Sequence, residues 1–122
     1  MEHYGLHGSF HAVAGKRQEL VDVLLEAATL MEAADGCLLY VVSTSADENA
    51  VFVTEIWRTE ADHDASLRIA GVSDLIKRAR PLIAGTAEST RLAVRGGQGL
   101  AFSHPPAAAP VGHARPSPAA SR

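Results

Sequence analysis

The feature that most constrains the fold is a pair of neighbouring segments that are apolar on both faces. Residues 37–43 read Cys-Leu-Leu-Tyr-Val-Val-Ser, and residues 51–58 read Val-Phe-Val-Thr-Glu-Ile-Trp-Arg. A polar run at 44–49 separates them, which is the pattern of an antiparallel hairpin. A strand with one side in water alternates apolar and polar residues, and neither segment does so. Both faces of this hairpin therefore require cover.

The segments on either side of the hairpin predict one strand and a long helix before it. Residues 4–13 alternate with a period of two, which is typical of a strand. Residues 16–34 carry apolar side chains at helical spacing and end at Asp35-Gly36, so we expect a helix closed by a left-handed glycine.

After the hairpin the sequence predicts a helix pair and a last strand. Thr59, followed three residues later by Asp62, forms a weak capping box and starts a helix that runs to about Ala70. Ser73 is the expected cap of a second short helix, which Pro81 ends. Residues 88–95 are the expected final strand.

The order strand, helix, strand, strand, helix pair, strand predicts an α+β fold, the ferredoxin-like split βαβ sandwich. The helices can cover only one face of its antiparallel sheet. A second copy of the same sheet would cover the other face, and the two sheets together would form a dimeric α/β-barrel with a cavity between them. We therefore expect a homodimer.

The chain is long enough for one domain, at 122 residues. We place that domain at residues 1–100. Residues 101–122 are rich in Ala, Pro and Ser and have scarcely a large apolar residue after Phe102, so we expect a disordered tail.

Charge and cysteine content exclude several classes of protein. The net charge of −3 is not segregated into blocks, so we expect no nucleic-acid partner. The single cysteine, Cys37, cannot form an internal disulfide and fits a reducing compartment, where it serves as a small buried hydrophobe. The chain also lacks a signal-peptide pattern and an apolar run of the roughly 18 residues that a membrane span needs. We expect a cytoplasmic protein with no membrane partner.

Within the second apolar segment, alternation places Glu55 and Trp57 on one face. If Phe52 and Ile56 face the helices, then Glu55 and Trp57 face the cavity between the two sheets. A partly desolvated carboxyl group has a raised pKa and can exchange protons, and an indole supplies a flat wall for stacking. The alternative is that Trp57 is a packing anchor and that Glu55 pairs with an arginine, for which Arg58, Arg91 and Arg95 are the candidates.

Tyr40 and His63 are the other candidate site residues. Tyr40 lies on the neighbouring strand and either reaches the same space or places its hydroxyl at the rim. His63 lies in the first turn of its helix between two aspartates, which favour its charged form; it is either a proton acceptor at the cavity mouth or a solvent-facing histidine.

The sequence favours no cofactor. His7 and His11 share a strand face without a third convergent ligand, so we expect no metal. The run Gly96-Gly97-Gln98-Gly99 lacks the lysine and the following helix of a phosphate-binding loop.

Five segments in order carry a family resemblance. They are Ala14-Gly15-Lys16, Asp35-Gly36-Cys37-Leu38-Leu39-Tyr40, Thr54-Glu55-Ile56-Trp57, His63-Asp64-Ala65-Ser66-Leu67 and Arg80-Pro81-Leu82-Ile83-Ala84-Gly85. With these segments the chain resembles the antibiotic biosynthesis monooxygenase (ABM) domain family from residue 4 to about residue 100, and most of all its branch of candidate quinol monooxygenases.

The resemblance implies a dimeric ferredoxin-like barrel that oxidises an electron-rich phenol or hydroquinone with O2, using no flavin, haem or metal. It therefore predicts a cofactor-independent monooxygenase acting on a quinol or polycyclic phenol, with an aromatic small molecule and O2 as its partners. By this resemblance His63, Glu55 and Trp57 are catalytic, and Tyr40 and Trp57 bind the substrate.

The sequence departs from the family pattern in the helix after the tryptophan. Many relatives carry a histidine in the middle of this helix, where this chain has Ser66, and His63 is offset by most of a helical turn. Neither Ser66 nor Leu67 can ligate haem iron, so haem cleavage is disfavoured. Two other functions remain open: a non-catalytic dimeric module that binds an aromatic small molecule, and a dimeric scaffold without a ligand.

Overall fold

A computed structural model describes residues 2–100 of the chain, and the expected tail at 101–122 lies outside the described residues. The regular elements, in chain order, are β1 (His3–Ala12), α1 (Arg17–Leu30), β2 (Cys37–Thr44), β3 (Ala50–Trp57), α2 (Glu60–Ser66), α3 (Val72–Ala79) and β4 (Ile83–Val94). Short 3-10 turns at Met31–Ala33 and Arg80–Leu82 extend α1 and α3.

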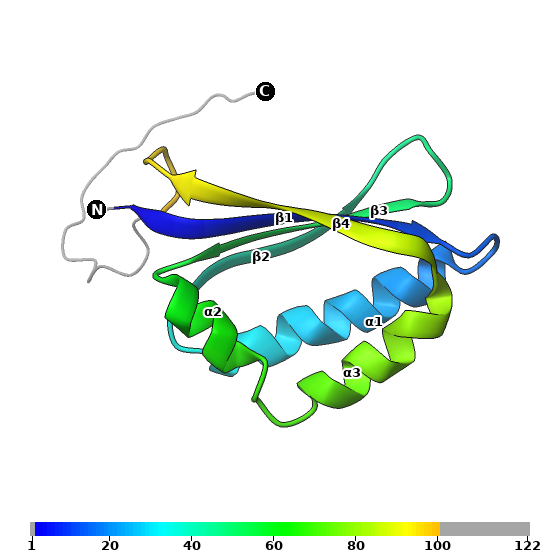
Figure 1. The fold of residues 1–122 in the computed structure, drawn as a ribbon, viewed down its shortest axis with the longest axis horizontal. Coiled ribbons are helices and arrows are strands. Elements are labelled where there is room, and N and C mark those ends of the chain that lie inside the picture. Colours follow the sequence, from blue (N-terminus) through cyan, green and yellow to red (C-terminus); the bar gives the residue numbers. More distant parts are fainter. Residues whose placement is uncertain (1, 101–122) are drawn as a thin grey trace, which may run out of the picture.

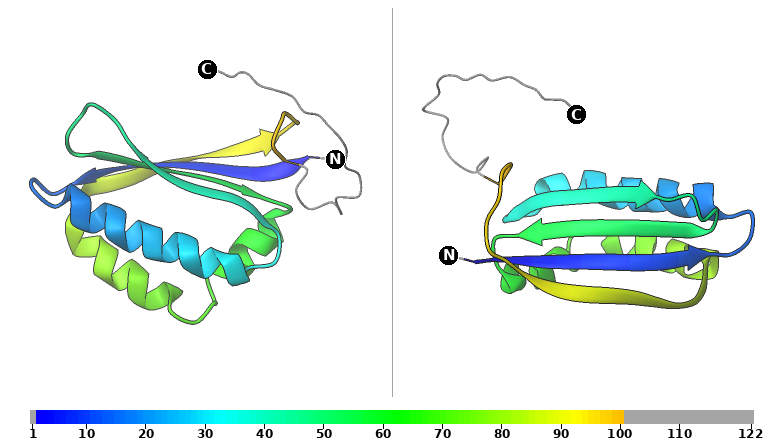
Figure 2. Two further views of the ribbon diagram at one scale, coloured as in Figure 1. Left: turned by 180° about the vertical axis from the view of Figure 1, so that it is seen from behind. Right: turned by 90° about the horizontal axis from the view of Figure 1, so that it is seen from above.

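The four strands form one antiparallel sheet in the order β2-β3-β1-β4. All three helices lie on the same side of it (Figure 1). Figure 2 shows the opposite side of the sheet in its right-hand view, with the helices behind it. This is the ferredoxin-like α+β fold, so the predicted fold class is confirmed.

Local signals in the sequence set some element ends correctly and others wrongly. The Thr59 hydroxyl accepts a hydrogen bond from the Asp62 backbone N–H at 3.1 Å, which confirms the predicted cap of α2. The Ser73 cap is wrong: Gly71 precedes α3, and no side chain caps it. β4 begins at Ile83 rather than near residue 88, because its first residues pair with the end of β1 despite their low strand propensity.

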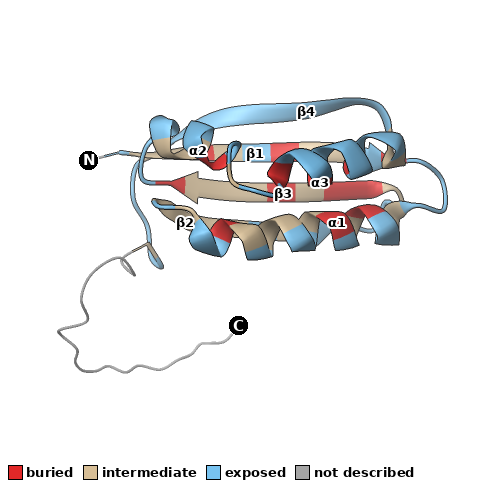
Figure 3. Ribbon diagram, turned by 90° about the horizontal axis from the view of Figure 1, so that it is seen from below, coloured by how far each residue is buried: buried red, intermediate tan, exposed pale blue. Residues whose placement is uncertain are grey.

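The sheet face expected for Glu55 and Trp57 is also wrong. Val51 and Trp57 are completely buried, and they pack against residues of the helices and the turn after α1 rather than facing away from them. Figure 3, seen from the helix side, marks the buried segments of α1, α3 and β3 in red. The cause is the register with β1, which pairs Tyr4 with Trp57 and Phe10 with Val51, so that the apolar residues of both strands share one face.

The other side of the sheet, here called the outer face, carries apolar side chains that no described element covers. They are Leu39, Val41, Phe52, Ile56 and Leu92. Val41 and Leu92 are the most exposed of them, at 44% and 45%. Between residues 2 and 100, no helix has both the length and the apolar character to cross a membrane.

Candidate active site

A cavity of ≈ 140 Å³ lies between the sheet and the helices, inside a single chain. Its walls are mainly apolar side chains of α1 and α3. Four polar residues join them: Tyr40 from β2, Glu55 from β3, and His63 and Ser66 from α2. Three of the four candidate site residues therefore converge on one cavity, which is not the space between two sheets that the sequence suggested.

Glu55 is a carboxyl group removed from water, with 15% of its side chain exposed. Burial raises its pKa, and two weaker effects oppose that rise. The first is a hydrogen bond of 2.9 Å that the Trp57 indole N–H donates to Oε1, and the second is attraction to His63. None of the three arginines considered from sequence pairs with Glu55: Arg58 pairs with Asp62, Arg91 with Glu60 and Arg95 with Glu2.

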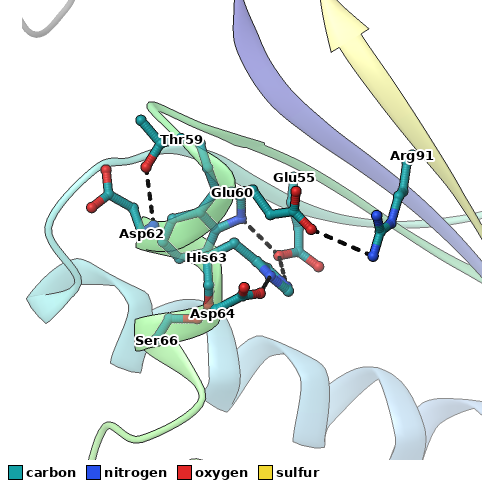
Figure 4. A network of polar contacts seen from close by, with 9 residues as sticks. Glu55, Thr59, Glu60, Asp62, His63, Asp64, Ser66 and Arg91 are labelled. Atoms are coloured by element: carbon teal, nitrogen blue, oxygen red, sulfur yellow. Dashed lines mark hydrogen bonds and ion pairs between the residues drawn. The ribbon is translucent and has the colours of Figure 1, made fainter.

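His63 links the buried carboxyl group to the protein surface (Figure 4). Its Nε2 lies 4.0 Å from Glu55 Oε1, and its Nδ1 lies 3.0 Å from Asp64 Oδ1. The imidazole is 16% exposed, whereas the Asp64 side chain is 60% exposed. A separation of 4.0 Å exceeds a hydrogen bond, so proton transfer between the two groups would require a side-chain rotation or a bridging water.

Aromatic rings fix the orientation of His63. The Tyr4 ring lies 5.6 Å from the imidazole between centroids, and the Trp57 ring meets it edge-on at 5.6 Å. Tyr4 was missed in the sequence analysis, although the alternation of β1 and its pairing with Trp57 place it on this face. Burial raises the pKa of Tyr4.

Trp57 does not form the stacking wall that the sequence suggested. Its side chain is fully buried against Met31 and Val72, and it is not among the residues that line the cavity. Its polar contact is the hydrogen bond to Glu55. The indole therefore holds the carboxyl group in place and touches no cavity contents in this geometry.

Tyr40 does reach the cavity, beside its cross-strand partner Glu55. Burial raises the pKa of the Tyr40 phenol above its usual range, and the nearby Glu55 and Cys37 add to the rise. The phenol is therefore neutral at physiological pH and can donate a hydrogen bond to an oxygen atom bound near Glu55.

The Ser66 hydroxyl is buried and donates a hydrogen bond of 2.6 Å to the His63 backbone carbonyl. It is thus engaged within α2. Its contact ties the end of α2 to the residue that faces Glu55.

Residues 2–100 contain no group of three His, Cys, Asp or Glu side chains close enough to hold a metal ion. His7 lies on the outer face, 3.1 Å from the Thr54 hydroxyl, and His11 lies 3.4 Å from Asp47. Cys37 is half-buried, and burial raises the pKa of its thiol.

Comparison with known proteins identifies the class. The family profile of antibiotic biosynthesis monooxygenases matches residues 4–78. A crystal structure of a candidate antibiotic biosynthesis monooxygenase from Chloroflexus aurantiacus J-10-fl is 38% identical, covers 80% of this chain and 98% of its own, and superimposes with a TM-score of 0.74. The chain belongs to the antibiotic biosynthesis monooxygenase family.

More distant structures share the fold. Rv0793 from Mycobacterium tuberculosis is 21% identical with a TM-score of 0.71, and the match covers 79% of this chain and 98% of that one. A single-residue mutant of SnoaB, a cofactor-independent oxygenase from Streptomyces nogalater, is 16% identical with a TM-score of 0.70, and the match covers 80% and 98%. A search of curated proteins gives no significant match.

Proposed function

We propose that this protein is a cofactor-independent monooxygenase that oxidises a quinol or polycyclic phenol with O2. The observation that carries the proposal is the buried Glu55 carboxyl group in an apolar cavity, with His63 between it and the surface. Family membership supports the same reaction class. Burial raises the pKa of the Glu55 carboxyl group, which makes its ionised form a stronger proton acceptor.

In the proposed reaction Glu55 removes the phenolic proton of the substrate. The resulting anion is electron-rich and passes an electron to O2, and the two radicals then combine while they are held together in the cavity. One oxygen atom stays in the product and the other leaves as water, with the substrate supplying the electrons. The apolar cavity favours these steps because little water reaches the substrate anion to protonate it before it reacts with O2.

Each polar residue has a separate part in this mechanism. His63 takes the proton from Glu55, and Asp64 holds the imidazole with Nδ1 directed toward the surface. Tyr40 donates a hydrogen bond to the substrate oxygen as its negative charge develops. Trp57 acts as a positioning residue through its hydrogen bond to Glu55.

The test is O2 uptake with a panel of hydroquinones and anthrone-like phenols, measured against the rate of autoxidation. Wild-type protein should accelerate consumption of at least one panel member. Glu55→Gln should lower that rate by about 100-fold or more, as is typical for loss of an acid–base group. Glu48→Gln, an exposed change in the hairpin, is the matched control. A panel consumed at the autoxidation rate would contradict the proposal.

A second candidate is a non-catalytic module that binds an aromatic small molecule. The engagement of Ser66 within α2 favours it, because its hydroxyl is bonded to the His63 backbone carbonyl and is not free to act as an acid or base in the cavity. In that case a panel member would bind with micromolar affinity and be recovered unchanged after prolonged exposure to O2. Glu55→Gln would then alter affinity at most.

The proposal also includes a homodimer joined through the outer face and a location in the cytoplasm. Exposed apolar side chains on the outer face support the first. The free, half-buried Cys37 thiol is in keeping with the second.

A further inference from the structure

A second chamber adjoins the cavity on the helix side of the sheet. Its volume is ≈ 250 Å³, and its floor is made by strands, with Leu6, Gly8 and Phe10 of β1 and residues 87–89 of β4 among its lining residues. Gly8 pairs directly with Ser89, so this row of the sheet has little side-chain volume. The chamber is therefore space that small side chains leave over β1 and β4.

The cavity and the chamber meet at a constriction. Three residues line both spaces: Leu24 from α1, Tyr40 from β2 and Glu55 from β3. A side chain that borders two neighbouring spaces lies between them. Tyr40 and Glu55 are direct partners in the sheet, whereas Leu24 belongs to a helix packed over it. The constriction therefore has a polar side on the sheet and, among the described residues, an apolar side formed by Leu24.

The two spaces reach the surface in different places. The cavity extends to Leu67, just after α2, and to Ile76 of α3, whose side chains are 50% and 40% exposed. The chamber extends to residues 87–89 of β4, which are exposed. Figure 3 shows β4 in pale blue at the edge of the sheet, away from α1. A ligand can therefore approach Glu55 from either side, and it passes Leu24 only if it occupies both spaces.

The cavity alone has room for one aromatic ring. Its volume of ≈ 140 Å³ is close to that of the engineered cavity of about 150 Å³ that holds a benzene molecule. A ligand that places one ring in the cavity and a second, fused ring beyond it must cross the constriction. The side chain of Leu24 lies on that path.

Leu24 is the member of the constriction that acts through its size alone. The Glu55 carboxyl group is held by the 2.9 Å hydrogen bond from the Trp57 indole N–H, and Tyr40 is fixed beside it by strand pairing. Both of these residues also carry polar groups. Leu24 carries none, and it packs against the apolar core from α1. A change at Leu24 therefore alters the width of the constriction and leaves its polar side in place.

We propose that Leu24 is a specificity-determining residue that sets the number of fused rings the protein accepts. With leucine at this position, a ligand is confined to one side of the constriction. With alanine, which lacks every atom beyond Cβ, the cavity and the chamber become one space. The inference rests on the proposed function only in taking the cavity as the ligand site, and it holds whether or not the bound phenol is oxidised.

The test compares the binding of phenol and of 2-naphthol, which has one more fused ring, by titration calorimetry at pH 7. The measured quantity is the affinity for 2-naphthol divided by the affinity for phenol. Leu24→Ala should raise this ratio by about ten-fold or more over wild type, because the second ring then buries its apolar surface. Phenol fits the cavity in both proteins, so the change should appear mainly in the affinity for 2-naphthol.

Two control variants separate volume at the constriction from other effects. Leu25→Ala makes the same chemical change at the next residue of α1, whose side chain is 48% exposed and lines neither space. Leu24→Met keeps the volume at the constriction nearly constant. Both variants should keep the wild-type ratio of affinities. A ratio that rises equally in Leu25→Ala would show a general loosening of α1 and would overturn the role of Leu24.

Leu24→Val is the variant to measure if Leu24→Ala does not fold, because it removes less volume from the core. It should raise the ratio in the same direction by a smaller factor, with a circular dichroism spectrum that matches wild type. An unchanged ratio in a folded Leu24→Ala protein, or in Leu24→Val where only that variant folds, would show that two-ring ligands bind on one side of the constriction. That result would refute the proposal.

These measurements record binding alone, so they can fail separately from the proposed reaction. A raised ratio in Leu24→Ala without O2 uptake from any panel member would support the role of Leu24 and refute the monooxygenase. O2 uptake with an unchanged ratio would do the reverse. No detectable binding of either phenol to any of these proteins would refute the cavity as a ligand site, and the role of Leu24 with it.

Discussion

The Glu55 carboxyl group lines the cavity, where its burial makes the ionised form unfavourable. Because burial raises its pKa, the folded state prefers the protonated form more strongly than the unfolded state does. The stability that this group contributes is therefore complete below the unfolded-state pKa and is lost as the pH rises through the folded-state pKa. At neutral pH an ionised Glu55 reduces the free energy of unfolding.

Replacing Glu55 with glutamine should therefore stabilise the protein at high pH. The amide has no charge to desolvate, and its carbonyl can still accept the Trp57 hydrogen bond. Thermal unfolding should give a higher Tm for Glu55→Gln than for wild type at pH 8, and the difference should shrink toward pH 4. Glu48→Gln should show no such trend. A difference in Tm that stays constant between these pH values would contradict a raised pKa.

Trp57 should affect catalysis without touching the substrate. Trp57→Phe removes the N–H that favours the carboxylate form, so the pKa of Glu55 should rise further. Leaving a buried acceptor without its donor should also cost about 1–3 kcal/mol of unfolding free energy. Urea denaturation measures the second effect. The first is measured as a shift of the acidic limb of the pH–rate profile to higher pH, and an unshifted limb would show that the hydrogen bond does not tune Glu55.

At the scale of elements, alternation in the sequence was sufficient to pair Glu55 with Trp57 but not to choose their face. Every second residue of β3 is apolar on either side, so β3 by itself contains no signal for the helix side. β1 contains that signal, because His7 and His11 lie on one face of the strand and Phe10 on the other. Phe10 pairs with Val51 of β3, so the apolar face of β1 determines which face of β3 lies against the helices. Only the register, a long-range property, connects the two strands.

The residues of the candidate site could also be predicted only in part from the sequence. Tyr40, Glu55 and His63 were found because an acid, a phenol and a histidine are unusual beside apolar runs. The buried position of Trp57 and the contact of Tyr4 with His63 depend on the placement of α2 over the sheet. That placement follows from packing between segments far apart in the chain, which local patterns do not report.

The turn before β2 should be sensitive because it meets α2. Gly36 and Gly15 have nearly the same left-handed backbone, with φ of 82° and 81°. A side chain at Gly36 would collide with the carboxyl group of Asp62, which Arg58 holds by a 2.8 Å hydrogen bond, whereas a side chain at Gly15 meets open space.

The matched pair Gly36→Ala and Gly15→Ala isolates this contact. Both should lose the roughly 1 kcal/mol that alanine costs in a left-handed conformation, and Gly36→Ala should lose at least about 1 kcal/mol more because Asp62 must move. Chemical denaturation compares the two. Equal losses would mean that α2 adjusts freely to the turn.

At the scale of the whole molecule, the two faces of the sheet have different roles. The cavity lies on the helix side, between β2, β3 and the helices, and so on the opposite side of the sheet from the outer face. The outer face presents apolar side chains at a size of domain that buries only about 60–65% of its unfolded surface. Association through the outer face would therefore stabilise the fold without contributing to the cavity.

This separation predicts that a monomeric variant keeps its ligand. Leu92→Lys places an ammonium group in the outer face. If two sheets meet there, burying this unpaired charge costs at least about 2 kcal/mol. The dimer dissociation constant should then rise by about 30-fold or more. Leu25→Lys is the matched control, because Leu25 is 48% exposed on α1 and Leu92 is 45% exposed on the outer face. Light scattering should find a dimer for wild type and Leu25→Lys and a monomer for Leu92→Lys at micromolar concentration. The Leu92→Lys monomer should still consume the panel phenol that wild-type protein consumes in the O2-uptake assay. Loss of that activity with an intact circular dichroism spectrum would show that a second chain completes the site.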